Sequence, residues 1–233
     1  MTRLRRVLQA QELLDLHQPN TRLLGQSLAH VAQVNRWLGG DRSVLVTLNA
    51  TRKDGPLELL DVGTGSAALP RRIVRWARRR NLPIRVCATD INPQILALAR
   101  EACRNYPEID VQEANALRLP YSNGAFTHAL LTLTLHHFEV AQQTAVLHEL
   151  VRVSRCAVII SELERCWPNY LGARLLAATW WRNNPITRHD GPLSVLRAFT
   201  PAELRAAAQK AGVPGPVQRH FFFRLVLVAG NNG

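Results

Sequence analysis

The sequence lacks the patterns that would indicate a zinc site, a redox pair or a membrane span. No two of its four cysteines form a C-x-x-C pair, which argues against a zinc or thiol-exchange motif. No apolar run approaches the roughly 20 residues that cross a bilayer. Glutamine, glutamate and aspartate closely follow the basic residues 2–6 and interrupt any signal-peptide pattern. We therefore expect a cytoplasmic protein with reduced thiols, no bound metal and no membrane span.

Lysine is almost absent as well. Lys53 and Lys210 are the only lysines, so the formal net charge of +12 comes almost wholly from arginine. Such charge could neutralise the phosphates of a nucleic acid, or it could coat a solvated surface. Neither a zinc motif nor a basic patch with interleaved aromatic residues accompanies it. The composition therefore favours a solvated surface, including the six arginines that crowd residues 71–80.

Short apolar runs alternate with helical patterns through most of the chain, which predicts an open α/β sheet with helices on both faces. The tail holds two further strand patterns around Arg224, joined too closely for a crossover helix, so these strands must pair antiparallel. We therefore predict a Rossmann-like, doubly wound, mostly parallel seven-stranded sheet with an antiparallel last strand. The strand patterns cover residues 57–62, 84–89, 109–112, 125–133, 157–161 and two parts of 217–229.

Helical patterns precede this sheet and interrupt it. Leucines and valines recur at helical intervals through the first 50 residues, with breaks at residues 19–20 and 39–40. We expect an N-terminal helical lid over residues 1–55 and a ligand-binding domain over residues 56–233. Within that domain we expect a helical insertion at about residues 164–199, broken between Asn183 and Pro192.

The stretch LLDVGTGSAALP, residues 59–70, has the form of a nucleotide-binding turn. Gly63 and Gly65 let the backbone approach a ligand closely, and their spacing to Ala68 also fits the dinucleotide fingerprint. Asp61, however, ends the strand before the turn, where its carboxylate would repel a pyrophosphate and attract a cation. S-adenosylmethionine is a cation without phosphate, so Asp61 favours that cofactor over a nicotinamide dinucleotide.

Asp90 ends the second strand pattern. A carboxylate at this place can accept both ribose hydroxyls of a nucleoside, or it can cap the helix that Asn92 and Pro93 begin. We favour the ribose contact, which supports a nucleoside cofactor without identifying it.

Three stretches resemble, in order, the motifs of class I S-adenosylmethionine-dependent methyltransferases: DVGTGSA, ATDINPQILALAR and VQEANALRLPYSNGAFTHALLTLTLHHF. The small-molecule branch that includes ubiquinone and menaquinone biosynthesis methyltransferases is the most similar. The resemblance covers about residues 57–153. It departs from the family at Ala67, where a third glycine is usual, and at Thr127, where an acid is common.

The resemblance implies S-adenosylmethionine as the cofactor and assigns residues to its parts. Asp61, Gly63 and Gly65 would line the methionine, with the backbone of Leu131 nearby. Asp90 would hold the ribose, and Ile91 would pack on the adenine. Asn115 and Ala116 would meet the adenine amino group, with the amide oxygen of Asn115 as acceptor in place of the usual aspartate. The implied cofactor residues are Asp61, Gly63, Gly65, Asp90, Ile91, Asn115, Ala116 and Leu131.

Candidates for the chemistry lie after the fourth strand and in the insertion. His136 or His137, as a neutral imidazole, could take the proton of a phenol, or the pair could simply cap the strand and pack. Trp180, Trp181 and His189 could line an acceptor pocket, although adjacent tryptophans on a helix point to different sides, so at most one of them should face it. His189 could also belong to a plain turn.

We therefore expect a methyltransferase that acts on a small hydrophobic acceptor, at a phenolic or quinol oxygen. One alternative is an RNA or protein methyltransferase that uses the basic surface. Against it, the chain has no appended nucleic-acid module and no Asn-Pro-Pro-Tyr-like motif after the fourth strand, so we do not expect a nucleic-acid partner. A nicotinamide-dependent oxidoreductase, or a protein that binds the cofactor without turnover, also stays open.

Overall fold

Seven strands form one mixed sheet in the order β3-β2-β1-β4-β5-β7-β6. The computed structural model describes residues 4–230, so the outer limits predicted for the two domains, residues 1 and 233, lie outside the described residues. β1 to β5 run parallel, whereas β7 is antiparallel to both of its neighbours, β5 and β6. This confirms the predicted Rossmann-like sheet. The strands are β1 Leu57–Val62, β2 Ile84–Asp90, β3 Ile109–Glu113, β4 Phe126–Thr132, β5 Ser154–Leu163, β6 Val217–His220 and β7 Arg224–Gly230.

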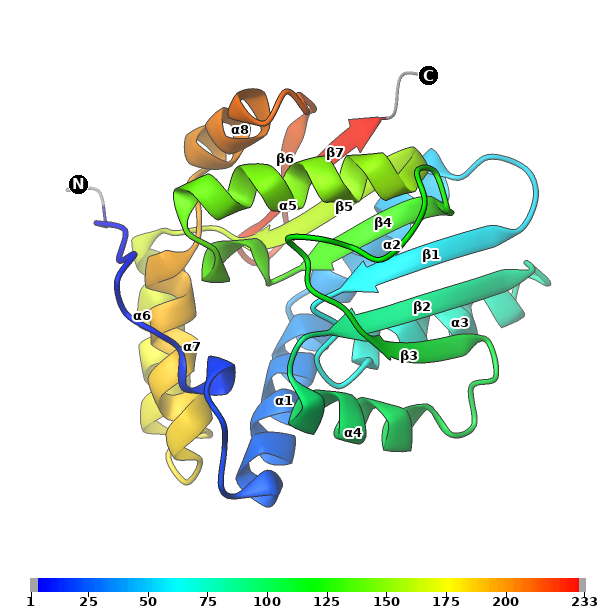
Figure 1. Ribbon diagram of the computed structural model, residues 1–233. Coiled ribbons are helices and arrows are strands. Elements are labelled where there is room, and N and C mark those ends of the chain that lie inside the picture. The colour runs from blue at the N-terminus through cyan, green and yellow to red at the C-terminus, as the bar shows by residue number, and fades with distance from the viewer. Residues whose placement is uncertain (1–3, 231–233) are drawn as a thin grey trace.

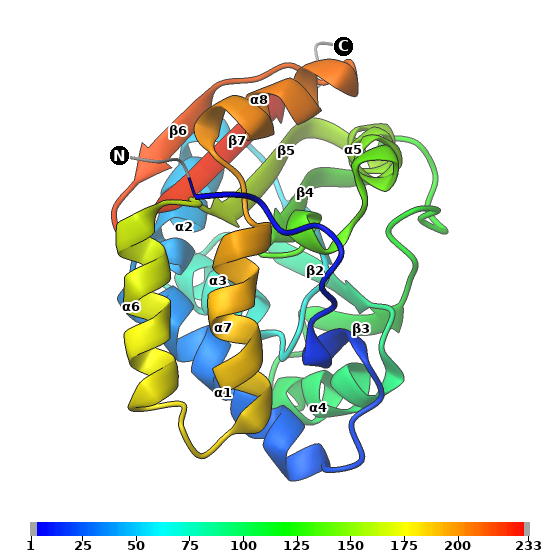
Figure 2. The ribbon, with the colours of Figure 1, turned by 90° about the vertical axis from the view of Figure 1, so that its left-hand side faces the viewer.

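Helices cover both faces of the sheet (Figure 1). α2, α3 and α4 bury their apolar sides on one face, and α5 and α8 do so on the other. α1, α6 and α7 stand instead beyond the carboxyl ends of the parallel strands (Figures 1 and 2). The helices are α1 Thr21–Trp37, α2 Gly40–Thr51, α3 Ala68–Arg78, α4 Pro93–Cys103, α5 Val140–Val153, α6 Trp167–Ala178, α7 Pro185–Arg197 and α8 Pro201–Lys210, with 3-10 turns η1 Leu13–Asp15 and η2 Leu135–His137.

β1 shows why the sequences of the central strands are mostly apolar. Leu57 and Leu59 belong to the core under α2, α3 and α4, whereas Leu60 and Val62 belong to the core under α5 and α8. Successive side chains of a strand point to opposite faces, and both faces of this sheet are covered, so almost every position must be apolar. Glu58 and Asp61 are the exceptions in β1. Glu58 is partly exposed near the start of the strand, whereas Asp61 lies near the carboxyl end, where ligands bind in this fold.

The N-terminal segment differs from the predicted helical lid. Residues 4–20 are extended apart from η1, and the first long helix begins only at Thr21. α2 is part of the main core, because Val44 and Leu48 pack with the residues of β1. The extended arm and α1 are therefore the N-terminal parts that lie over the carboxyl ends of the strands.

The break in the helical insertion also lies earlier than predicted. α7 starts at Pro185, after Asn184 accepts a hydrogen bond from the backbone N–H of Thr187, and it continues through Pro192. A side chain at Gly191 would have its Cβ 2.4 Å from the ring of Trp181. Gly191 thus serves helix packing, and the Gly-Pro pair that indicated a turn in the sequence lies inside a helix.

At two positions, Ala67 and Thr127, the sequence departs from the family pattern, and local contacts of the structure accommodate both residues. Ala67 precedes α3 in the left-handed region, with φ of 52°, which costs about 1 kcal/mol for a residue with a Cβ. The Thr127 hydroxyl donates to the carbonyl of Glu58 at 2.9 Å and accepts from its N–H at 3.1 Å. It therefore joins β4 to β1 where the family commonly has an acid.

Within residues 4–230, no helix is both long enough and apolar enough to cross a membrane. All four cysteines are free thiols; Cys87 and Cys103 are buried, and Cys156 and Cys166 are partly buried.

Candidate active site

A cavity of about 830 Å³ lies at the carboxyl ends of β1, β2 and β4. The glycine turn after β1 and the segments after β2 and β4 line one part of it. The N-terminal arm, α1, α6 and α7 line the rest. The cavity therefore sits at the point where the strand order reverses, which is the usual ligand site of a doubly wound sheet.

At the glycine turn, two backbone N–H groups already have hydrogen-bond partners, and acidic side chains face the cavity. The N–H of Gly65 donates to Oδ2 of Asp90 at 3.1 Å, and the N–H of Thr64 donates to the carbonyl of Thr89 at 2.8 Å. A pyrophosphate binds through such turn amides, and here these two already have partners. The buried carboxyl of Asp61 lines the same wall. This wall therefore suits a cationic, phosphate-free ligand.

Burial, with the nearby carboxylates of Asp90 and Asp41, raises the pKa of Asp61 to about 7, although a hydrogen bond from Thr64 opposes the rise. Burial also raises the pKa of Asp90, although the backbone N–H groups of Asn92 and Gly65 hydrogen-bond its carboxylate and oppose the rise. Two buried acids beside one cavity give it a negative wall that a bound cation would stabilise.

The other residues assigned to the cofactor divide between the cavity and the core. Gly63, Gly65, Ile91, Asn115 and Ala116 line the cavity. The amide oxygen of Asn115 already accepts the N–H of Leu117 at 2.9 Å, and its second lone pair is available to a ligand.

Leu131 lies outside the lining. It is fully buried in the core under α5, and the following residues Thr132, Leu133 and Thr134 form the wall instead. The chain turns at Leu133, which has φ of 54°. The assignment to Leu131 is therefore corrected to the three residues that follow it.

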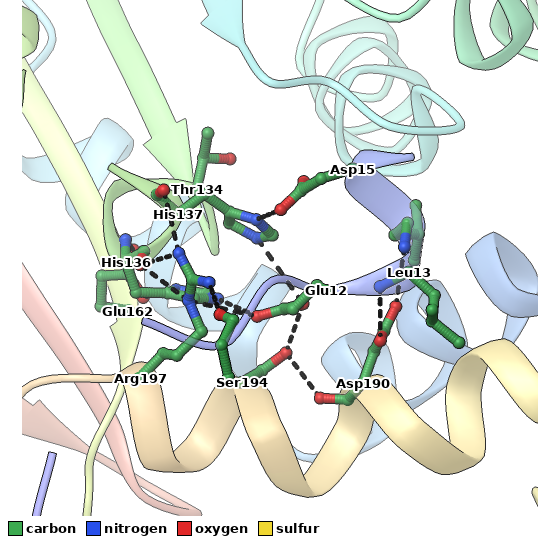
Figure 3. Close-up of polar contacts among 12 residues, drawn as sticks. Glu12, Leu13, Asp15, Thr134, His136, His137, Glu162, Asp190, Ser194 and Arg197 are labelled. Atoms are coloured by element: carbon green, nitrogen blue, oxygen red, sulfur yellow. Dashed lines mark hydrogen bonds and ion pairs between the residues drawn. The ribbon is translucent and has the colours of Figure 1, made fainter. Parts of the chain in front are cut away.

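No sequence pattern indicated the acidic residues that surround the two histidines. The N-terminal arm carries Glu12 and Asp15, and β5 carries Glu162 (Figure 3). The arm is fastened to α7 because the N–H groups of Leu13 and Leu14 donate to the two carboxylate oxygens of Asp190, at 2.8 and 2.9 Å.

His136 is buried between two glutamates. Its Nδ1 lies 2.7 Å from Oε2 of Glu162, and its Nε2 lies 3.5 Å from Oε1 of Glu12. Burial alone would lower the pKa of this imidazole, but the two carboxylates outweigh it and raise the pKa to about 10. The expectation that His136 acts as a neutral base is therefore corrected, because its ring holds its proton at neutral pH.

His137 is the more accessible of the two histidines, with 23% of its side chain exposed. Its Nδ1 lies 2.9 Å from Oδ2 of Asp15, and its Nε2 lies 3.8 Å from Oε2 of Glu12 (Figure 3). A carboxylate on one ring nitrogen fixes the orientation of the other. His137 therefore presents an oriented Nε2 at the wall of the cavity.

Only one of the three residues predicted for the acceptor pocket lines the cavity. Trp181 is buried there against α7, whereas Trp180 stacks on Trp37 with ring centroids 5.4 Å apart. His189 lies outside the lining, with Nδ1 2.7 Å from Asp190. The assignments to Trp180 and His189 are corrected, because neither side chain lines the cavity. The two tryptophans also lie in the turn between α6 and α7 and not on a helix.

Apolar side chains line the part of the cavity that is formed by α1, α6 and α7. This part is wide enough for a small acceptor beside the acidic wall. Its apolar residues include Leu28, Val31, Ala173, Leu176, Trp181 and Val195.

The central segment of the chain is similar to known methyltransferases and to parts of larger proteins. Residues 59–156 match the model of the methyltransferase domain. A non-reducing polyketide synthase of Monascus ruber is 24% identical over 140 residues, which are 58% of this chain and 5% of that protein. The aligned region is thus only about a twentieth of the length of the curated relatives it matches.

Solved structures share the fold. An S-adenosylmethionine-dependent methyltransferase from Aquifex aeolicus has a TM-score of 0.65 at 15% identity, over 88% of this chain and 97% of that chain. Human N-acetylserotonin methyltransferase in complex with S-adenosylmethionine has a TM-score of 0.64 at 16% identity, over 92% of this chain and 57% of that chain. The chain therefore has the fold of class I S-adenosylmethionine-dependent methyltransferases, and its residues 59–156 match a methyltransferase domain, which supports S-adenosylmethionine as the cofactor.

Proposed function

We infer that this chain transfers a methyl group from S-adenosylmethionine to a phenolic or quinol oxygen of a small hydrophobic acceptor. The observation that carries this proposal is the composition of a single cavity. An acidic wall at the glycine turn, an apolar wall of α1, α6 and α7, and an oriented histidine line the same space.

The residues at the acidic wall would hold the cofactor. Asp61 would face its positive charge, Asp90 would accept its ribose hydroxyls, and Ile91 would cover its adenine. The cofactor supplies a methyl group on a sulfonium, which is already a good leaving group. The protein therefore has to orient the acceptor and exclude water, and we assign the exclusion of water to the extended arm and α1, which act as a lid.

His137, oriented by Asp15, is the residue that we assign to the acceptor oxygen. A phenol has a pKa near 10, so at neutral pH it needs help to lose its proton. An imidazole at the cavity wall can hydrogen-bond the hydroxyl and accept that proton. The similarity in fold to an enzyme named for N-acetylserotonin supports a small-molecule acceptor.

The alternatives have less support. Arg72 forms an ion pair with Asp41 at 2.9 Å, and Arg78 forms one with Glu108 at 2.7 Å. These contacts fit a solvated arginine face on α3 better than a nucleic-acid surface. The paired amides and acidic groups of the glycine turn disfavour a nicotinamide dinucleotide.

The test is methyl transfer from isotopically labelled S-adenosylmethionine to a panel of phenols and quinols, followed by mass spectrometry. We expect the label on oxygen, and we expect His137→Ala to lower kcat about 100-fold without weakening cofactor binding. His189→Ala is the matched control, because His189 also pairs with an aspartate but lies outside the cavity. Label on none of the acceptors, or equal turnover of the two variants, would contradict the assignment.

A further inference from the structure

We propose that Glu12, His136 and His137 form a binding site for a divalent transition-metal ion at the wall of the cavity. The affinity of this site for a metal ion is independent of the proposed function. Its part in catalysis rests on that function.

The ligand atoms converge as such a site requires. One ligand atom from each of the three residues lies within 4.8 Å of the other two. Nε2 of His136 is 3.5 Å from Oε1 of Glu12, and Nε2 of His137 is 3.8 Å from Oε2 of Glu12. Metal–ligand bonds of about 2.1 Å in a tetrahedron place the ligand atoms about 3.4 Å apart. An ion would therefore fit after small side-chain movements.

The outer contacts of the two histidines are those of metal ligands. Each ring places its Nδ1 on a carboxylate, at 2.7 Å from Glu162 for His136 and at 2.9 Å from Asp15 for His137 (Figure 3). A histidine that ligates a metal usually donates its other N–H to a carboxylate in this way, which fixes the free nitrogen toward the ion. Here both free nitrogens are turned toward Glu12.

Two buried polar atoms at the centre of the site have no hydrogen-bond partner in the described part of the chain. They are Nε2 of His136 and Oε1 of Glu12, which belong to residues only 2% and 3% exposed. Buried polar atoms are normally satisfied. Their ion-pair contact at 3.5 Å is longer than a hydrogen bond, and a shared metal ion would satisfy both atoms.

The local charge also favours a cation. Glu12, Glu162 and Asp15 bring three carboxylates to the two rings. Arg197 offsets one of them, with Nε 3.9 Å from Oε1 of Glu12. An ion would displace the proton that His136 otherwise holds, and the surrounding carboxylates would stabilise the ion in its place.

Among the described residues, three side chains reach the ion, so the coordination would remain open toward the cavity, as in catalytic rather than structural sites. In the metal-bound protein Nε2 of His137 is a ligand, so the ion would take over from the imidazole base and would activate the acceptor hydroxyl by lowering its pKa. It would also favour acceptors with two neighbouring oxygens, such as catechols or ortho-acyl phenols, because these can occupy two open positions.

Cobalt titration tests the site without any measurement of activity. Tag-free protein is stripped with a chelator and titrated with Co²⁺, and the visible absorption of four- or five-coordinate cobalt is followed. We expect one bound ion per chain in the wild type and in the control His189→Ala. We expect no such spectrum from Glu12→Gln or His137→Ala, and about 10- to 100-fold weaker binding from Asp15→Asn.

The outcomes separate the two proposals. A wild type without the cobalt spectrum, or a His137→Ala variant that binds cobalt as well as His189→Ala does, overturns the metal site. Calorimetry with S-adenosylmethionine on the same samples shows independently whether the cofactor site is intact. Circular dichroism checks the fold, and if Glu12→Gln does not fold, the partly exposed His137 decides the result.

Discussion

At the scale of single residues, the most consequential group is the buried carboxyl of Asp61. Its pKa of about 7 means that near neutral pH the protein can hold it charged or uncharged with little difference in free energy. A sulfonium cofactor would favour the charged form. The group that we propose selects the ligand is therefore also one whose charged state is not favoured by folding alone.

This predicts that cofactor affinity depends on pH. Because the charged form of Asp61 binds the cation, lowering the pH from about 8 to about 6 should weaken binding of S-adenosylmethionine about tenfold. Calorimetry at the two pH values measures the effect. In Asp61→Asn the affinity should be low and nearly independent of pH. A wild type with equal affinity at both pH values would exclude ionisation of Asp61 as the selective step.

The stability of the cofactor-free protein should change with pH in the opposite direction to cofactor affinity. The folded-state pKa of Asp61 is about 7 and its ordinary value is 3.8, so the folded protein binds more protons than the unfolded chain between these values. Its contribution to the free energy of unfolding therefore falls as the pH rises through that range.

Asp61→Asn should accordingly stabilise the cofactor-free protein at about pH 8, by about 2 kcal/mol, and change it little at about pH 4. Thermal denaturation of both proteins at the two pH values measures this difference. A variant that is less stable than the wild type at the higher pH would show that the carboxylate is favourably solvated after all.

Two glycines of the turn provide a matched pair of substitutions. A Cβ at Gly63 would lie 2.5 Å from Oγ1 of Thr134, and φ there is +69°. At Gly65 φ is +56°, but the nearest atom, Cδ2 of Leu28, is 3.7 Å away. Gly65→Ala should cost about 1 kcal/mol, from backbone strain alone.

Gly63→Ala should cost about 3 kcal/mol, because a steric clash adds to the strain. Urea denaturation of the two variants gives the comparison. Equal losses would mean that the Thr134 side chain moves away freely, and that the close contact does not fix the turn.

At the scale of elements, the extended arm over residues 4–20 contributes no buried residue to the hydrophobic core clusters and is held mainly by hydrogen bonds. The carboxylate of Asp190 on α7 accepts the N–H groups of Leu13 and Leu14. These bonds place Glu12 and Asp15 beside the histidines. The arm should therefore open locally without unfolding of the sheet.

Asp190→Ala removes both bonds and should release the arm. Limited proteolysis should then cut within residues 4–20 at least several-fold faster, while the thermal transition of the sheet changes by only a few degrees. His189→Ala, which keeps the Asp190 carboxylate, should be cut at the wild-type rate. If cleavage of the two variants is equally slow, other contacts hold the arm.

Most elements of the sheet could be predicted because their signals are local. The strand Leu57–Val62 has the predicted bounds. A local motif, the capping box of Thr200 and Glu203, likewise starts α8. The arm could not be predicted in this way. Its leucines recur at helical spacing, but hydrogen bonds to α7, far along the chain, hold it extended.

The site could be predicted only in part, for the same reason. Asp61, Gly63 and Asp90 follow consecutive strands and lie in recognisable motifs. Asp15 and His137, by contrast, are 122 positions apart, and no sequence motif relates them. Tertiary packing alone brings the carboxylates of Glu12 and Glu162 to His136, and these carboxylates keep its imidazole from acting as a neutral base.

At the scale of the whole molecule, a parallel sheet brings the ends of β1, β2 and β4 to one edge, and helices from both ends of the domain close over it. The resulting cavity has one acidic wall and one apolar wall. The arginines of α3 contribute to the net charge of +12 and do not line this cavity. At least part of the arginine on α3 is neutralised by Asp41 and Glu108.

The central claim is that the glycine turn selects a positively charged nucleoside without phosphate. Parallel calorimetry with S-adenosylmethionine, its demethylated product and NAD tests it most directly. We predict one binding site per chain for the first two ligands, with the methylated cofactor weakened most by Asp61→Asn, and no measurable heat with NAD. Saturable binding of NAD, with none of S-adenosylmethionine, would contradict the account.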